Sequence, residues 1–81
     1  MSEQEIEAWI VSLLRETRAE LVEVEISAEM SFEDLGLDSL TRIDVLAAAE
    51  VEFEMEVPDG EVANIVTVRD LVGFISAVRV G

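Results

Sequence analysis

The stretch of this chain whose residue types could carry out or receive chemistry is LGLDSL, Leu35 to Leu40, in which Ser39 follows Asp38. Ser39 could be a helix cap, a catalytic nucleophile or a hydroxyl to which another group is attached. A catalytic serine needs a base to accept its proton, and the chain has no histidine and no lysine. Adjacency in sequence does not align the Asp38 carboxylate with the hydroxyl. We therefore expect no enzyme activity, which leaves a cap or an attachment point for Ser39.

The charge of the chain limits its possible partners. It contains 19 acidic residues against five arginines, which gives a formal net charge of −14. Such a charge argues against nucleic acid and anionic membranes as partners, and favours a basic protein surface. There is no cysteine for a disulfide or a usual zinc site. Asp34, Asp38 and Asp44 do not match the spacing of a calcium-binding loop, so no metal site is predicted.

The length of 81 residues predicts a single domain, residues 1–81. The first residues lack the basic and apolar segments of a signal peptide. The longest apolar run, Val45 to Ala49, is too short to cross a bilayer. We expect a monomeric, cytoplasmic protein. The initial Met1 and the absence of linkers suggest a free-standing chain.

Three helices are expected from apolar spacing. Ser2 and Glu5 form a capping-box pattern before a helix over residues 3–17. A second helix begins near Asp38 or Ser39 and ends near Glu54, before Val57-Pro58. Thr67 and Asp70 resemble another capping box, and a helix over residues 68–78 follows.

The segments between these helices are less regular. Residues 18–37 show no sustained period and predict a long loop, anchored by Phe32 and Leu35, with a positive φ or a close backbone approach at Gly36. A short helix is expected over residues 61–64. The fold class is therefore all-α: a small four-helix bundle of three main helices and one short helix, with a long loop between the first and second helices.

The sequence resembles the phosphopantetheine-dependent carrier proteins. The similarity centres on FEDLGLDSL, Phe32 to Leu40, around the family's Asp-Ser-Leu core. It continues through EFEMEVPD, Glu52 to Asp59, and IVTVRDL, Ile65 to Leu71. The complete string at these distances is far more specific than Asp-Ser-Leu alone.

The resemblance implies that Ser39 receives the 4'-phosphopantetheine arm of coenzyme A, added by a separate Mg²⁺-dependent phosphopantetheinyl transferase. The arm would carry acyl groups as thioesters. This agrees with a chain that has no thiol and no base of its own. The implied partners are acyltransferase or ligase enzymes and ketosynthase-type enzymes with basic docking patches. An unmodified acidic interaction module is the more distant alternative.

Further site residues are also implied by the resemblance. Partner recognition would involve Asp38, Leu40, Ile43, Asp44 and Ala47. The alternative for Asp44 is a solvated helix face, and the alternative for Ile43 and Ala47 is the edge of the core. A possible acyl-chain cavity would involve Val45, Leu46, Ala49, Phe53, Ile65 and Leu71, which are core on any interpretation. We expect Leu37 and Leu40 to hold the turn against the bundle. The chain departs from the family at Thr41, where an acid is frequent, and at Arg42, which puts a positive charge beside the attachment point.

The spacing F-x-x-L-G-x-D-S resembles carriers of polyketide and related natural-product biosynthesis. Many fatty-acid synthase carriers have one more residue between the Phe and the Gly, and peptidyl carriers more often read L-G-G-x-S. We therefore favour a polyketide or other specialised pathway, with a fatty-acid synthase carrier or an aminoacyl or peptidyl carrier as alternatives.

Overall fold

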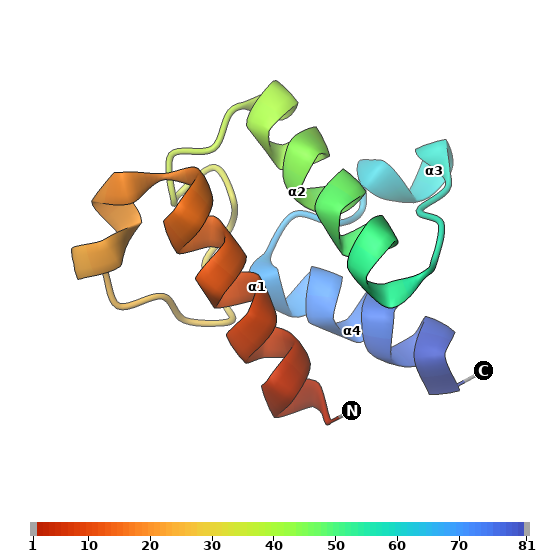
Figure 1. Ribbon diagram of the computed structural model, residues 1–81. Helices are drawn as coiled ribbons and strands as arrows, with labels where there is room; N and C mark the ends of the chain where they lie inside the picture. The colour runs from red at the N-terminus through yellow and green to blue at the C-terminus, as the bar shows by residue number, and fades with distance from the viewer. Residues whose placement is uncertain (1, 81) are drawn as a thin grey trace.

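The computed structural model describes residues 2–80, and the side chains of residues 2–78 (Figure 1). Within this part the chain forms four α-helices and one 3₁₀ helix, η1. Their bounds are α1 (Glu3–Thr17), η1 (Ala19–Glu23), α2 (Ser39–Phe53), α3 (Asp59–Val62) and α4 (Val68–Val80). The expected all-α bundle, with three main helices, one short helix and a long first loop, is confirmed. Met1, which contributed to the expectation of a free-standing chain, lies outside the described residues.

Helix α1 supplies one wall of the core. The expected capping box is present, because the Ser2 hydroxyl accepts from the Glu5 N–H at 3.2 Å and the Glu5 carboxylate accepts from the Ser2 N–H at 3.1 Å. Its buried side chains, Ile6, Ile10 and Leu14, recur at helical spacing and pack toward α4 and α2. Trp9 is half-buried against Phe53 of α2, with ring centroids 5.0 Å apart and ring planes at 77°.

The long loop contains η1, which was not expected from the sequence. Only Leu21 of this turn is buried, and Val22 is 62% exposed. The Arg15 side chain donates to the carbonyls of Leu21 at 3.3 Å and Val24 at 3.2 Å, which ties the turn to α1. A five-residue 3₁₀ helix that buries one residue gives no helical period, so the apolar pattern could not reveal it.

The second half of the loop is clipped to the start of α4. The Phe32 N–H donates to the Val66 carbonyl at 2.9 Å, and the Val68 N–H donates to the Met30 carbonyl at 3.1 Å. These bonds flank an isolated antiparallel bridge between Ser31 and Thr67. The clip seats Phe32 in the core with 1% exposure, as expected for this anchor.

The segment after α2 differs from expectation in its helix bounds. Helix α3 begins at Asp59, two residues earlier than predicted, because the Pro58 carbonyl already accepts from the Glu61 N–H at 2.8 Å. Helix α4 runs to Val80, two residues past the expected end. Its buried residues Val68, Leu71, Val72 and Ile75 have the predicted spacing.

Candidate functional site

A tight turn carries the loop into α2. Gly36 has a φ of 84°, as expected, which a residue with a Cβ adopts only with strain. The Leu37 N–H donates to the Phe32 carbonyl at 3.0 Å, and the Leu37 side chain is 6% exposed. Leu37 therefore holds the turn against the bundle. Leu40 does not, because it is 74% exposed on the side of α2 away from Val45 and Leu46.

Asp38 is the residue that caps α2. Its side chain accepts from the Thr41 N–H at 2.8 Å, and its carbonyl accepts from the Arg42 N–H at 2.9 Å. The Thr41 hydrogen bond lowers the pKa of the Asp38 carboxyl, and the positive charge of Arg18 contributes less. Ser39 is then the first helical residue and not the cap, which removes one of the two interpretations that the sequence left open.

The Ser39 side chain is exposed, and its hydroxyl has no hydrogen-bond partner within the described residues. It lies where the first N–H groups of a helix point outward and the helix dipole is positive. A phosphate group is favoured at such a position. Ser39 is therefore accessible to another enzyme, and the fold does not use its hydroxyl.

A groove of about 370 Å³ opens beside Ser39. Its lining residues come from the loop, from the start of α2 and from the segment before α4: Phe32, Glu33, Leu37, Asp38, Ser39, Arg42 and Val66. The clip between residues 28–32 and 66–69 brings the two outer walls together. The groove is thus a product of long-range pairing, which local sequence patterns do not show.

Arg42 lines this groove, and its guanidinium group lacks good hydrogen-bond acceptors. One terminal nitrogen, Nη1, donates to the Ile65 carbonyl at 3.5 Å, which is at the outer limit of a hydrogen bond. Its Nε is buried without a partner. Among the described side chains no carboxylate forms an ion pair with Arg42. The positive charge of Arg42 is evident from the sequence, but its unpaired nitrogen depends on the packing around it.

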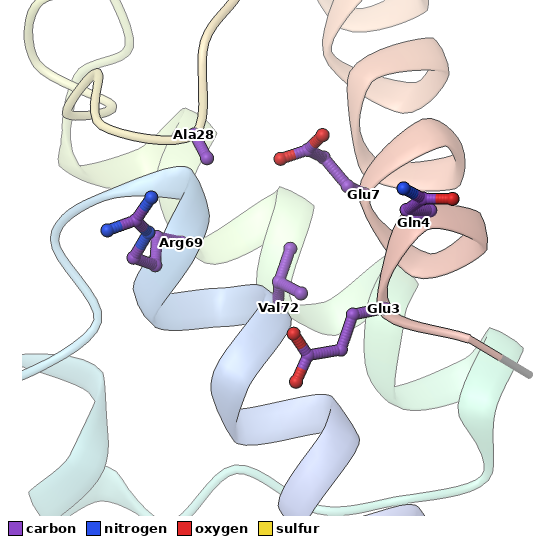
Figure 2. Close-up of a pocket in the computed structure, with 6 residues that line it drawn as sticks. All are labelled: Glu3, Gln4, Glu7, Ala28, Arg69 and Val72. Carbon is purple, nitrogen blue, oxygen red and sulfur yellow. The ribbon is translucent and has the colours of Figure 1, made fainter.

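A second depression, of about 190 Å³, lies between α1 and α4 (Figure 2). Glu3, Gln4 and Glu7 line it from α1, while Arg69 and Val72 line it from α4. Its arginine is already neutralised, because Arg69 pairs with Glu29 at 2.5 Å. Residues of the LGLDSL stretch take no part in its lining. We therefore place the candidate site at the Ser39 groove.

The predicted recognition residues share the exposed side of α2. Asp38, Leu40, Ile43, Asp44 and Ala47 are all exposed, with Ile43 at 49%. Val51, which is 81% exposed, extends the apolar series but was not among the predicted residues. Its helical spacing from Leu40, Ile43 and Ala47 is the signal in the sequence that could have identified it.

The six residues proposed for an acyl-chain cavity are all buried. None is more than 3% exposed: Val45, Leu46, Ala49, Phe53, Ile65 and Leu71. They form part of the packed core, and the groove beside Ser39 is lined by other residues.

Comparison with known proteins bears directly on the Ser39 turn. A family model, the phosphopantetheine attachment site, matches residues 8–75. The chain is 37% identical over 71 residues to an acyl carrier protein of Rickettsia bellii, covering 86% of each protein. It is 36% identical over 77 residues to an acyl carrier protein of Acidothermus cellulolyticus, covering 94% of this chain and 90% of the relative. The chain belongs to the acyl carrier protein family.

Membership of this family identifies the cofactor and shows that the protein is not an enzyme. Acyl carrier proteins carry a 4'-phosphopantetheine group that a phosphopantetheinyl transferase adds, and they serve biosynthetic enzymes without being catalysts themselves. The part of the groove beside Ser39 fits a phosphate, because the unpaired Nε of Arg42 and the start of α2 both favour one there. The carboxylates of Glu33 and Asp38 also line the groove and act against an anion. No helix in the described part of this carrier is both long and apolar enough to traverse a membrane.

Proposed function

We propose that this carrier protein holds acyl intermediates on a phosphopantetheine arm attached to the Ser39 hydroxyl. The observation that carries the proposal is the division of labour at the start of α2, where Asp38 caps the helix and the exposed Ser39 hydroxyl has no partner among the described residues. A serine that capped the helix would be tied to the backbone. A serine released from capping can react without loss of helical structure.

The chain contributes position, and other enzymes contribute chemistry. On transfer from coenzyme A, a bond forms between the Ser39 oxygen and phosphorus, and the bond from that phosphorus to the adenosine bisphosphate part breaks. The serine proton goes to the transferase, because this chain has no histidine or lysine to receive it. The bound arm supplies the thiol that holds acyl groups as thioesters.

The exposed side of α2 is proposed as the docking surface for partner enzymes. Leu40 and Ile43 offer apolar contacts, and Asp44 beside them offers a negative charge. A basic patch on the partner complements a chain of net charge −14 and would also accelerate encounter. Acyltransferase or ligase enzymes and ketosynthase-type enzymes remain the proposed partners, and a cytoplasmic location remains part of the proposal.

The proposed pathway is polyketide or other specialised natural-product biosynthesis. Its support is the F-x-x-L-G-x-D-S spacing that ends at Ser39. The name acyl carrier protein, which both relatives bear, fits this pathway and fatty-acid synthesis equally. Loading assays on the modified protein, with polyketide-type, fatty-acid-type and peptidyl-type loading enzymes in parallel, distinguish these alternatives by which enzyme charges the arm. We also propose that the six core residues named above enclose the bound acyl chain.

The attachment is tested by incubating the protein with coenzyme A, Mg²⁺ and a transferase of broad specificity, followed by intact-mass measurement. We expect a gain of one phosphopantetheinyl group in the wild type and none in Ser39→Ala. The matched control is Ser12→Ala, which removes another exposed helical hydroxyl and should be modified fully. An equal mass gain in Ser39→Ala, or none in the wild type, would overturn the proposal.

A further inference from the structure

The described arginines differ in the number and quality of the hydrogen bonds and ion pairs that their guanidinium groups form. Arg15 donates to two backbone carbonyls, Arg18 pairs with Glu20 at 3.2 Å, and Arg69 pairs with Glu29. The guanidinium of Arg42 has a single hydrogen bond, of 3.5 Å, and a buried Nε without a partner. Among the described arginines, Arg42 is therefore the one whose guanidinium retains a buried N–H without an acceptor.

The position of Arg42 on α2 adds to this. It is the fourth residue of the helix, near the positive end of the dipole, where a cation is disfavoured. Burial of an unpaired guanidinium N–H also carries a cost. Both costs would be removed by an anion placed beside the first turn of α2, which the described side chains do not supply.

Ser39 stands three residues before Arg42 and lines the same groove. Residues at this spacing are neighbours on a helix surface, with Cβ atoms about 5–6 Å apart. Any anion attached to the Ser39 hydroxyl is therefore held within reach of the Arg42 side chain, and tethering keeps its local concentration high.

We propose that Arg42 binds the phosphodiester joining the arm to Ser39, and that it leaves its contact with the Ile65 carbonyl to do so. This inference rests on the proposed attachment at Ser39. A guanidinium presents a planar fork that suits phosphate oxygens. Arg42 thus has one position before modification and another after it, and it directs the first part of the arm along the groove past Phe32 and Val66.

Two carboxylates near the groove could compete for Arg42. Asp38 is already engaged as the cap of α2 through the Thr41 N–H. Glu33 lines the groove, but no ion pair joins it to Arg42 in the described structure. The first turn of α2 contains no acid, and its third position is Thr41. The phosphate is therefore the anion best placed for Arg42.

The test compares the ¹⁵N-labelled protein before and after modification, with completeness of modification established by intact mass. The Nε–Hε cross-peak of Arg42, assigned by its loss in Arg42→Gln, should move on modification, while those of Arg15 and Arg69 stay. Salt near 1 M, where the Debye length is about 3 Å, should move the peak part of the way back. The ³¹P resonance of the arm should shift in Arg42→Gln but not in Arg69→Gln, which removes an equal charge from an exposed pair.

Thermal unfolding gives a second measure. Modification should raise the melting temperature of the wild type by about 2–4 °C, and should raise that of Arg42→Gln by less, because only the N-terminus of α2 then faces the phosphate. A full mass gain with an unmoved Arg42 cross-peak would overturn this inference and leave the attachment at Ser39 standing. A wild type that gains no mass would overturn both proposals.

Discussion

The N-termini of α2 and α4 are capped in contrasting ways. At α4 a hydroxyl is the cap, because Thr67 accepts from the Asp70 N–H at 3.1 Å. In return, the Asp70 carboxylate accepts hydrogen bonds from the N–H groups of Val66 and Thr67, both at 3.1 Å. At α2 a carboxylate is the cap, the neighbouring hydroxyl of Ser39 is left over, and the first turn contains no acid.

The difference separates a structural helix start from one that is open to chemistry. The reciprocal bonds at α4 use the side chains at both ends of its first turn, so nothing there is free to react. At α2 a single side chain, Asp38, stabilises the turn, and the remaining positions are Ser39, Leu40 and Thr41. This incomplete arrangement leaves the start of α2 open to the phosphate that we propose is attached to Ser39.

The largest expected effect comes from removing the two hydroxyls in turn. Thr67→Ala should lower the free energy of unfolding by about 0.5–2 kcal/mol, because it removes a cap. Ser39→Ala should change it by less than about 0.5 kcal/mol, because Ser39 caps nothing. In a domain of this size each kcal/mol is worth about 4–8 °C of melting temperature, so thermal unfolding of the unmodified proteins resolves the two. Equal losses would mean that Ser39 does stabilise α2.

A smaller effect is expected from the charge of Asp70. Hydrogen bonds from the N–H groups of Thr67 and Val66 lower the pKa of its carboxyl. A lowered pKa stabilises the fold above the unfolded value of about 3.9, and this contribution is lost as the pH falls through the folded pKa. Asp70→Asn should therefore lower the melting temperature at pH 7, by less than Thr67→Ala does because an amide oxygen still accepts.

The pH series provides the check. The difference between wild type and Asp70→Asn should narrow below about pH 4 and vanish below the folded pKa. Asp38→Asn should follow the same trend at α2, because the Thr41 N–H lowers the pKa of Asp38 in the same way. A difference that stays constant from pH 7 to pH 3 would contradict a role for the carboxylate charge at both caps.

The features that could be predicted from the sequence are local. The boxes at Ser2 and Thr67, the positive φ of Gly36 and the buried stripe of α2 each depend on residues within one or two turns. The LGLDSL turn was also predicted, but whether Asp38 or Ser39 caps the helix stayed open. Both residue types cap helices well, and only the backbone geometry selects one.

What could not be predicted depends on distant segments. The groove exists because residues 28–32 pair with residues 66–69. Nothing in the sequence of either segment indicates that it pairs with the other. The unpaired Nε of Arg42 follows from that same packing. Leu40 was expected both to hold the turn against the bundle and to contact partners, and its exposure contradicts the first expectation. An apolar residue type alone does not give the direction of a side chain.

The smallest expected effect comes from giving α2 the acid that α4 has at its third position. Thr41→Glu should stabilise the unmodified protein by about 0.3–1 kcal/mol at low salt, because a carboxylate in the first turn faces the positive end of the dipole. Thr41→Gln, of the same size without the charge, is the matched control. The added charge also increases the repulsion within a chain of net charge −14, but those acids are spread along the sequence while the helix end is adjacent.

Salt separates these two electrostatic contributions. Raising the salt from about 10 mM to about 1 M shortens the Debye length from about 30 Å to about 3 Å. The melting temperature of the wild type should rise as repulsion is screened, while the advantage of Thr41→Glu over Thr41→Gln shrinks. The loss in Thr67→Ala should stay, because that cap is uncharged. Equal stability of the Glu and Gln variants at low salt would show that α2 gains nothing from an acid at its third position. In that case the absence of an acid at position 41 would not make the N-terminus of α2 less stable than that of α4.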